Sequence, residues 1–251
     1  MYGYCDKKSS HSAFDFTRGD QDIRFYPRQE KTSVHFYVLF LQNNLSNQKT
    51  TSFMLANQSI EKNLFIILYL NSIYPLSPSL KAFLIQKIKS CVFDKNEIIS
   101  KEGEICNRLY VIKQGMVRGY FISGSTEITT WIDAENEIFT SITGFFRNEK
   151  SREYIQSLED TYCDYLEYDD YKYCLENFPE MRQINRIMLE EYYILAEHRV
   201  YLARIPNARK RLIYFMENSK AQIVNRIPRK YLASFLAMRP ETLSRLMKEN
   251  A

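Results

Sequence analysis

The sequence predicts an α+β fold in which a group of short strands is followed by helices, and three observations support this. Short strand-like segments separated by turn residues occupy positions 92–168. A long amphipathic segment follows at 180–205, and two short helices separated by a tight turn are expected within 227–249. Strands first and helices afterwards is the order of an α+β protein rather than of alternating βαβ units.

The composition is that of a folded globular protein. The chain has 251 residues, of which 45% are hydrophobic and 25% charged, close to the usual averages. Its longest apolar runs, residues 36–41 and 64–70, are well short of the roughly 18 residues that a membrane helix needs. The first residues lack the basic start and apolar stretch of a signal peptide. We therefore expect a cytoplasmic protein without a membrane span.

The N-terminal segment has no assigned domain, because residues 1–53 show neither helical nor strand periodicity. A helical apolar face begins at Met54 and runs to the helix breakers Pro75 and Pro78. Two interpretations stay open. In the first interpretation, Met54 is the natural start and the preceding residues are an extension that is not native. In the second, those residues form a flexible arm or a small subdomain. The first folded domain is expected at residues 54–178.

The strand-like segments of this domain are separated by glycines at predicted turns, namely Gly103, Gly115 and Gly124. This spacing favours an antiparallel barrel or double-sheet roll. A short helix is expected at 169–178, before Pro179. The segments predicted as strands are 96–101, 108–114, 116–122, 126–133, 136–142, 153–159 and 161–168.

One long helix is expected over residues 179–205, with apolar residues at spacings of three, four or seven along one stripe. Such a stripe needs a partner, and a symmetric second copy of the chain is an economical one. The alternative is that the stripe packs onto its own β domain. The residues expected in a dimer contact are Ile184, Met188, Tyr192, Leu195 and Leu202.

The C-terminal domain, residues 206–251, has a helix-turn-helix pattern. Apolar residues at 231, 232, 235 and 236 give the first helix a buried face, and the small Ala233 allows a second helix to approach closely. Pro240 fits the first turn of the second helix, and Glu241 is favourable at its positive end. A plain αα-hairpin would share this spacing. Residues 204–251 also hold eleven Lys or Arg against three Glu, a net charge of +8, which suits a polyanion.

At these residues the chain resembles the Crp/Fnr family of transcription regulators. The family signature pairs an Ala-x-x-Leu first helix with a Glu-Thr-apolar-Ser-Arg second helix, and residues 233–236 and 241–245 match it. Residues 101–121, KEGEICNRLYVIKQGMVRGYF, resemble a strand hairpin of the same family. The resemblance covers about residues 75–251 and implies an antiparallel β-roll of the jelly-roll type, a dimerisation helix and a DNA-binding domain.

The resemblance also implies which side chains face DNA. Glu241 and Arg245 would face base edges, since carboxylates accept from cytosine and Arg donates to guanine. Other side chains would lie near phosphates or bases. Ala237 stands where the family usually has Gly, and the sequence leaves no room for a full β-hairpin wing. The complete predicted set is Arg239, Glu241, Thr242, Ser244, Arg245 and Lys248.

The effector segment departs from the family members that bind cyclic AMP. Arg152 can be placed on the arginine that holds the cyclic phosphate, but Ile142 stands where the ribose-binding Glu would be and Glu153 replaces a Ser. A carboxylate close to a phosphate is repulsive. We therefore expect Arg152 to be a surface residue and cyclic AMP not to bind. The candidate effector residues are Ile142, Thr143, Gly144, Phe145, Arg152, Glu153 and Tyr154.

Enzyme and metal sites are not expected. No Walker loop, GxSxG elbow or GxGxxG fingerprint occurs. The three histidines lie outside the predicted strands, and the five cysteines include no CxxC pair, so no metal or other cofactor is expected and the thiols are expected to be individually buried.

The leading hypothesis is a DNA-binding regulator that binds a two-fold symmetric operator as a homodimer, with RNA polymerase as a further partner and an unknown effector. The alternative is a ligand-binding module that acts through protein contacts without touching DNA.

Overall fold

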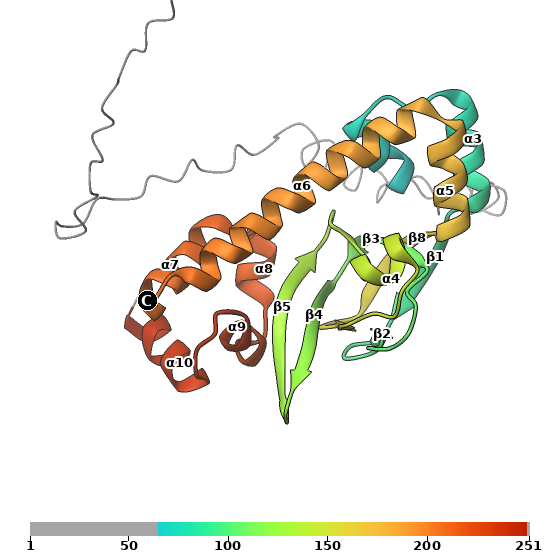
Figure 1. The fold of residues 1–251 in the computed structure, drawn as a ribbon. Helices are drawn as coiled ribbons and strands as arrows, with labels where there is room; N and C mark the ends of the chain where they lie inside the picture. The colour runs from blue at the N-terminus through green and yellow to red at the C-terminus, as the bar shows by residue number, and fades with distance from the viewer. Residues whose placement is uncertain (1–64, 250–251) are drawn as a thin grey trace, which may run out of the picture. The chain divides into compact units, whose positions relative to one another are not determined.

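A computed structural model of the chain describes residues 65–249 (Figure 1). The predictions for residues 1–53 and for Met54 as a start lie outside this range. Residues 65–73 are helical. Within 65–249, none of the helices combines the length and apolarity that a bilayer crossing requires. The further helices are α3 (Pro78–Lys87), α4 (Ile142–Arg147), α5 (Tyr168–Asn177), α6 (Pro179–Arg204), α7 (Ala208–Asn218), α8 (Ala221–Arg226), α9 (Arg229–Phe235) and α10 (Pro240–Glu249).

The strands form two antiparallel sheets with the orders β1-β8-β3-β6 and β2-β7-β4-β5. Fully buried residues from both sheets, among them Ile112, Val117, Ile155 and Cys163, meet in one core. The fold is thus an α+β fold with an antiparallel β-roll, as predicted. The strands are β1 (Lys89–Phe93), β2 (Ile98–Ser100), β3 (Arg108–Gln114), β4 (Met116–Ser123), β5 (Thr126–Ala134), β6 (Ile138–Phe139), β7 (Tyr154–Ser157) and β8 (Thr161–Glu167).

One predicted strand is partly wrong. The expected strand at 136–142 shortens to β6, and Ile142 instead begins α4. The hydroxyl of Ser141 accepts a hydrogen bond from the Gly144 N–H at 3.3 Å and caps this helix. Strand β1 lies entirely before residues 96–101, the first segment predicted as a strand, so the prediction missed it.

The long helix α6 lies within one residue of its predicted bounds, but both ends of its apolar stripe are covered by its own chain. Ile184 is fully buried in a cluster with Leu80 and Leu84 of α3. At the other end, Leu202 packs with residues of the C-terminal helices. The predicted dimer contact is therefore wrong at Ile184 and Leu202. Both residues pack within their own chain, which is the alternative that the sequence left open.

Helices α9 and α10 are the two helices predicted across a tight turn. Leu232, Leu236, Leu243 and Leu246 are buried between them and the preceding helices, in one cluster with Leu212 of α7. The guanidinium of α7 residue Arg211 secures the turn, since it donates to the carbonyls of Leu236 at 2.8 Å and Ala237 at 3.1 Å.

The turn holds Ala237 in the left-handed region, with φ of 48°. A side chain there costs about 1 to 2 kcal/mol, so this is the conformation for which Gly is preferred. Ala237→Gly is expected to raise the free energy of unfolding by about 0.5 to 1 kcal/mol, after the entropy that Gly loses on folding. Urea denaturation measures this. Ala233→Gly, within α9, is the matched control and should lower stability; an Ala237→Gly midpoint at or below that of the unaltered chain would refute the strain.

Candidate nucleic-acid interface and effector segment

Helix α10 separates an apolar face from a charged one. Leu243 and Leu246 face the core, while Glu241, Arg245 and Lys248 are exposed on the opposite side. Of the other predicted DNA-contact residues, Arg239 is exposed in the turn before the helix, and Thr242 and Ser244 are half-buried. The exposed polar residues recur at spacings of three and four, which places them on one stripe of the helix.

Glu249 binds Arg245 of this stripe and a second arginine from α7 in the free chain. The Glu249 carboxylate accepts from Arg245 at 2.9 Å and from Arg209 of α7. The hydrogen bond from Arg209, aided by Arg245, lowers the pKa of Glu249. Arg209 was not predicted as part of this surface, because it lies on another helix. Only the excess of basic residues after position 204 pointed to it.

Helix α4 and the residues after it form the candidate effector segment. Gly144 and Phe145 are buried, and a Cβ at Gly144 would lie only 2.9 Å from the backbone nitrogen of Cys106. The Ser141 hydroxyl donates to the hydroxyl of the buried Ser151 at 3.0 Å. The inner side of the segment is therefore packed closely against neighbouring parts of the chain. Ile142 and Thr143 are half-buried at the start of the helix.

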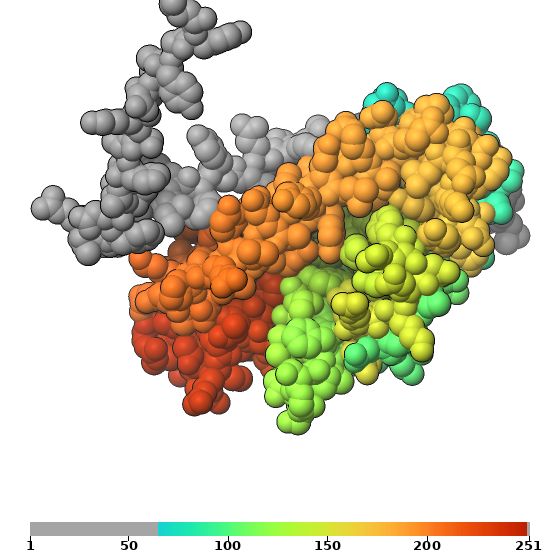
Figure 2. All heavy atoms as spheres, viewed as in Figure 1, coloured from blue at the N-terminus to red at the C-terminus, as the bar shows by residue number. Residues whose placement is uncertain are grey.

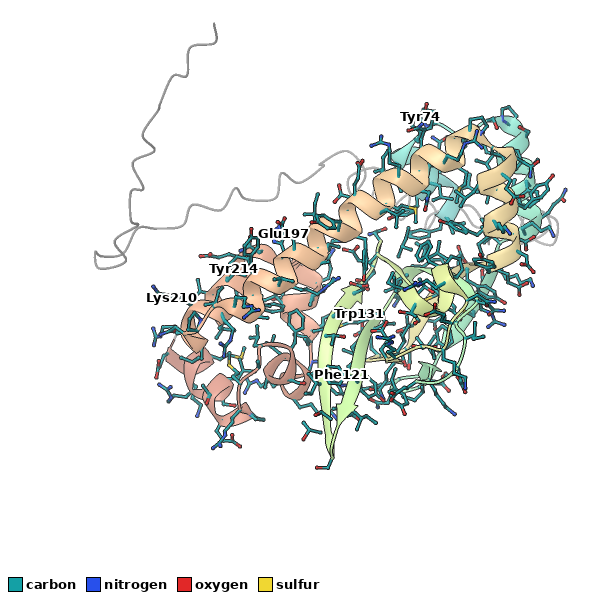
Figure 3. All side chains as sticks on the ribbon, viewed as in Figure 1. Tyr74, Phe121, Trp131, Glu197, Lys210 and Tyr214 are labelled. Atoms are coloured by element: carbon teal, nitrogen blue, oxygen red, sulfur yellow. The ribbon has the colours of Figure 1, made fainter. Side chains whose placement is uncertain are left out.

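The three remaining effector candidates point to different surroundings. Arg152 is exposed, as expected for a surface residue. Trp131 lies on β5 and is labelled in Figure 3. Its indole Nε1 donates to the Glu153 carboxylate at 2.8 Å. Burial raises the pKa of Glu153, and the indole hydrogen bond opposes this shift. Tyr154 stacks on Tyr120 of β4, with ring centroids 5.1 Å apart.

Ionisable residues of the β-roll lie near a cation of α6. Burial, reinforced by the nearby Glu137 carboxylate, raises the pKa of Asp133 to about 7, against the opposing effect of Arg199 on α6. The Arg199 guanidinium lies 5.4 Å from the ring centroid of Tyr192. A carboxyl group of the β-roll with a raised pKa therefore lies near a cation of the long helix.

Helix α6 lies at the surface over much of its length, shown in orange in Figure 2. Its exposed apolar residues are not the full set that was predicted. Tyr192 is exposed and Leu195 is half-buried, as a contact with another molecule allows. The half-buried Met188 packs against the same cluster as Ile184, within its own chain. The additional exposed apolar residues of α6 are Leu189, Tyr193, Ile194, Val200 and Tyr201.

Across residues 65–249, no group of three or more His, Cys, Asp or Glu is arranged to hold a metal ion. Of the cysteines in this range, Cys106, Cys163 and Cys174 are buried and Cys91 is half-buried, all as free thiols. Cys5 lies outside the described residues. Burial is the main cause of the raised thiol pKa at Cys91, to about 11, and at Cys174, to about 12, so these thiols are unreactive at neutral pH.

Comparison with known proteins matches residues 91–178 to the family of the cyclic nucleotide-binding domain. No curated protein matches the chain. Among solved structures, FixK2 from Bradyrhizobium japonicum has a TM-score of 0.56 and 17% identity, covering 64% of this chain and 83% of its own. A putative transcriptional regulator of the Crp/Fnr family from Eubacterium rectale has a TM-score of 0.57 and 16% identity, covering 71% and 87%.

A third similar structure is CLP of Xanthomonas campestris, described as a c-di-GMP responsive global regulator. It has a TM-score of 0.54 and 10% identity, and the match covers 69% of this chain and 91% of CLP. At these identities the likeness concerns the fold. The chain thus carries a segment that matches the cyclic nucleotide-binding domain, within a fold shared with structures of Crp/Fnr-type regulators.

Proposed function

We propose that the chain is a DNA-binding transcription regulator of the Crp/Fnr type. The observation that carries this is α10, which exposes Glu241, Arg245 and Lys248 over a buried apolar face, directly after a tight turn from α9. A second helix so presented can enter the major groove. The net charge of +8 after position 203 favours contact with phosphates. The similar structures include a putative transcriptional regulator and a global regulator.

The exposed side chains have distinct roles in this proposal. Arg245 donates two hydrogen bonds to a guanine, and Glu241 accepts from a cytosine amino group. Lys248 and Arg239, with the half-buried Thr242 and Ser244, contact phosphates or nearby bases and set the register on the duplex. Because Glu249 binds Arg245 in the free chain, this ion pair has to open before Arg245 reaches a base.

The regulator acts as a homodimer through the exposed apolar face of α6. Leu189, Tyr193 and Val200 lie four and seven residues apart, on one stripe that is free of its own chain's core. Two copies related by a two-fold axis would place two copies of α10 on successive half-sites of a symmetric operator. RNA polymerase in the cytoplasm is a further expected partner.

The effector is expected to differ from cyclic AMP. Glu153 stands where a phosphate-binding Ser would be, and its carboxylate is held by the indole of Trp131. Ile142 offers no acceptor for a ribose hydroxyl. Two lost hydrogen bonds to charged groups, at about 1.5 to 3 kcal/mol each, weaken binding by at least about a hundredfold. Calorimetry with cyclic AMP to millimolar concentration should show no saturable heat. Micromolar binding that Arg152→Ala abolishes would reverse this conclusion.

Salt-dependent binding to duplex DNA tests the proposed function. Fluorescence anisotropy of a labelled duplex should give an association constant that falls steeply as salt rises, because each neutralised phosphate releases counterions. The alternative, a ligand-binding module that acts through protein contacts, predicts no duplex binding at low salt. Loss of binding in a chain with Arg239, Arg245 and Lys248 all replaced by Gln would assign the effect to the α10 surface.

A further inference from the structure

The outer face of β4 is buried although it points away from the core of the roll. Val117 on the inner face lies in that core. Its neighbours Met116, Arg118 and Tyr120 alternate to the opposite face, and yet each is at most 4% exposed. The C-terminal helices cover them, since Met116 shares one apolar cluster with Leu232 and Leu236.

Arg118 lies at the centre of this covered face, with 1% of its surface exposed. Its guanidinium donates to Gln156 of β7 at 2.7 and 3.0 Å, to Thr129 of β5 at 3.2 Å, and to Glu127. The same guanidinium lies between two rings, 4.0 Å from the centroid of Tyr120 and 3.8 Å from that of Tyr231 on α9. A buried cation needs such compensation, and α9 supplies one of the two faces.

Ser234 of α9 completes the contact at the edge of the sheet. Strand β5 is at the end of its sheet, so its outer backbone groups lack a partner strand. The Ser234 hydroxyl accepts from the Thr129 N–H at 3.0 Å and donates to the Glu127 carbonyl at 3.0 Å. One side chain of the helix-turn-helix therefore forms hydrogen bonds with both a backbone N–H and a backbone carbonyl of the edge strand.

Ion pairs surround the same contact. Glu135, in the loop after β5, accepts from both Nη atoms of Arg226 on α8, at 2.8 and 2.6 Å. Glu137 pairs with Lys220, which precedes α8. These acids belong to the β-roll and the bases to the C-terminal helices, so the charges on the two sides are complementary.

The stack continues from Tyr120 to the candidate effector segment. Tyr154, next to Glu153, lies opposite Tyr120 in the pairing of β7 with β4 and stacks on its ring at 5.1 Å. Tyr154, Tyr120, Arg118 and Tyr231 thus form a continuous series of stacked groups. The series begins beside Arg152 and Glu153, at the positions that correspond to the phosphate site, and ends on α9, the first helix of the helix-turn-helix.

We propose that this series couples the effector segment to the orientation of α9 and α10. The proposal rests on the proposed function, which makes those helices the DNA-binding element. The contact leaves Glu241, Arg245 and Lys248 exposed, so it directs the DNA-binding surface without masking it. A shift of the Tyr154 ring alters the support of Arg118, and the Tyr231 and Ser234 contacts loosen with it. Fixed orientation lowers the entropic cost of binding two half-sites at once.

Hydrogen exchange in the whole free chain tests the coupling without any ligand. Ser234→Ala removes the acceptor of the Thr129 amide and should raise the exchange rate of that amide about tenfold. Tyr154→Leu, at the other end of the series, should also accelerate exchange of Thr129 and of residues 229–236. The matched control is Tyr162→Leu, an exposed tyrosine on the other sheet, which should change neither. Unchanged amides in β3 and β8 verify that each variant folds.

The exchange rates of the two variants distinguish docking of α9 from its coupling to the effector segment. If Ser234→Ala accelerates exchange but Tyr154→Leu does not, α9 is docked and the coupling is refuted. If neither variant has an effect, the docking itself is refuted. Because no DNA is present, failure of the chain to bind duplexes would overturn the proposed function alone. With DNA binding established, Ser234→Ala should lower affinity for the selected symmetric duplex about tenfold relative to random duplex.

Discussion

Replacing Val200 by Asp is expected to convert the proposed dimer to a monomer. Val200 is 61% exposed on α6, so the substitution leaves the folded chain intact. In a two-fold dimer the aspartate appears twice in an apolar contact, where an unpaired charge costs several kcal/mol. A loss of about 3 kcal/mol corresponds to more than a hundredfold weaker association. Sedimentation or light scattering at micromolar concentration measures it.

The chain offers a matched control for this prediction. Val92→Asp is the same change at a residue that is 56% exposed on β1, away from α6, and should leave the dimer intact. Tyr193→Asp, 71% exposed on the same stripe, should behave like Val200→Asp. A monomeric unaltered chain, or equal dissociation by Val92→Asp, would refute the α6 contact. Ile184→Asp is unsuitable, because Ile184 is buried in its own chain.

Replacing Arg245 by Ala is expected to weaken binding to the preferred duplex by about 1 to 3 kcal/mol and to relax the preference for one base pair. The reason is geometric, since the planar guanidinium can donate two hydrogen bonds to a guanine. Lys248→Ala should instead weaken binding to all sequences to a similar degree. Competition between the preferred duplex and random duplex, measured at one salt concentration, separates the two effects.

Arg245→Lys makes this test more specific, because lysine keeps the positive charge but cannot form the bidentate hydrogen bonds of a guanidinium. It should retain affinity for random duplex and lose most of the sequence preference. Arg245→Ala losses that are equal on preferred and random duplexes would show that Arg245 contacts only phosphates. Glu249→Gln, which frees Arg245 from its ion pair, should strengthen binding to both duplexes.

Local sequence patterns predicted most of the β-roll and the helix-turn-helix. Strands β3, β4 and β5 follow alternating or apolar runs that end at Gly115, at Gly124 and close to the turn at Asn136. The turn before α10 was indicated by Pro240, and Ala237 adopts the left-handed conformation expected of a residue at the glycine position. Each of these signals lies within a few residues of the feature that it predicts.

Features that depend on distant parts of the chain were not predicted. Helix α4 has six residues, too few to show a period, and its Ser141 cap is local but weak. The apolar stripe of α6 indicates burial without indicating the partner, so the sequence alone does not distinguish a dimer contact at Ile184 and Leu202 from packing within the chain. The contact of Ser234 with β5 joins residues 105 positions apart. Nothing in the pattern around Ser234 distinguishes it from an ordinary helix residue.

Selection of duplexes from a random pool by the unaltered chain tests the central claim most directly. The fold, the exposed face of α10 and the two-fold use of α6 together predict enrichment of a symmetric sequence. Its half-sites should be about one helical turn apart, 10 to 10.5 base pairs centre to centre, or a multiple of that spacing. Enrichment of such a sequence, lost with Arg245→Ala, is the expected result. A chain that retains no duplex, or retains all sequences equally, would contradict the claim.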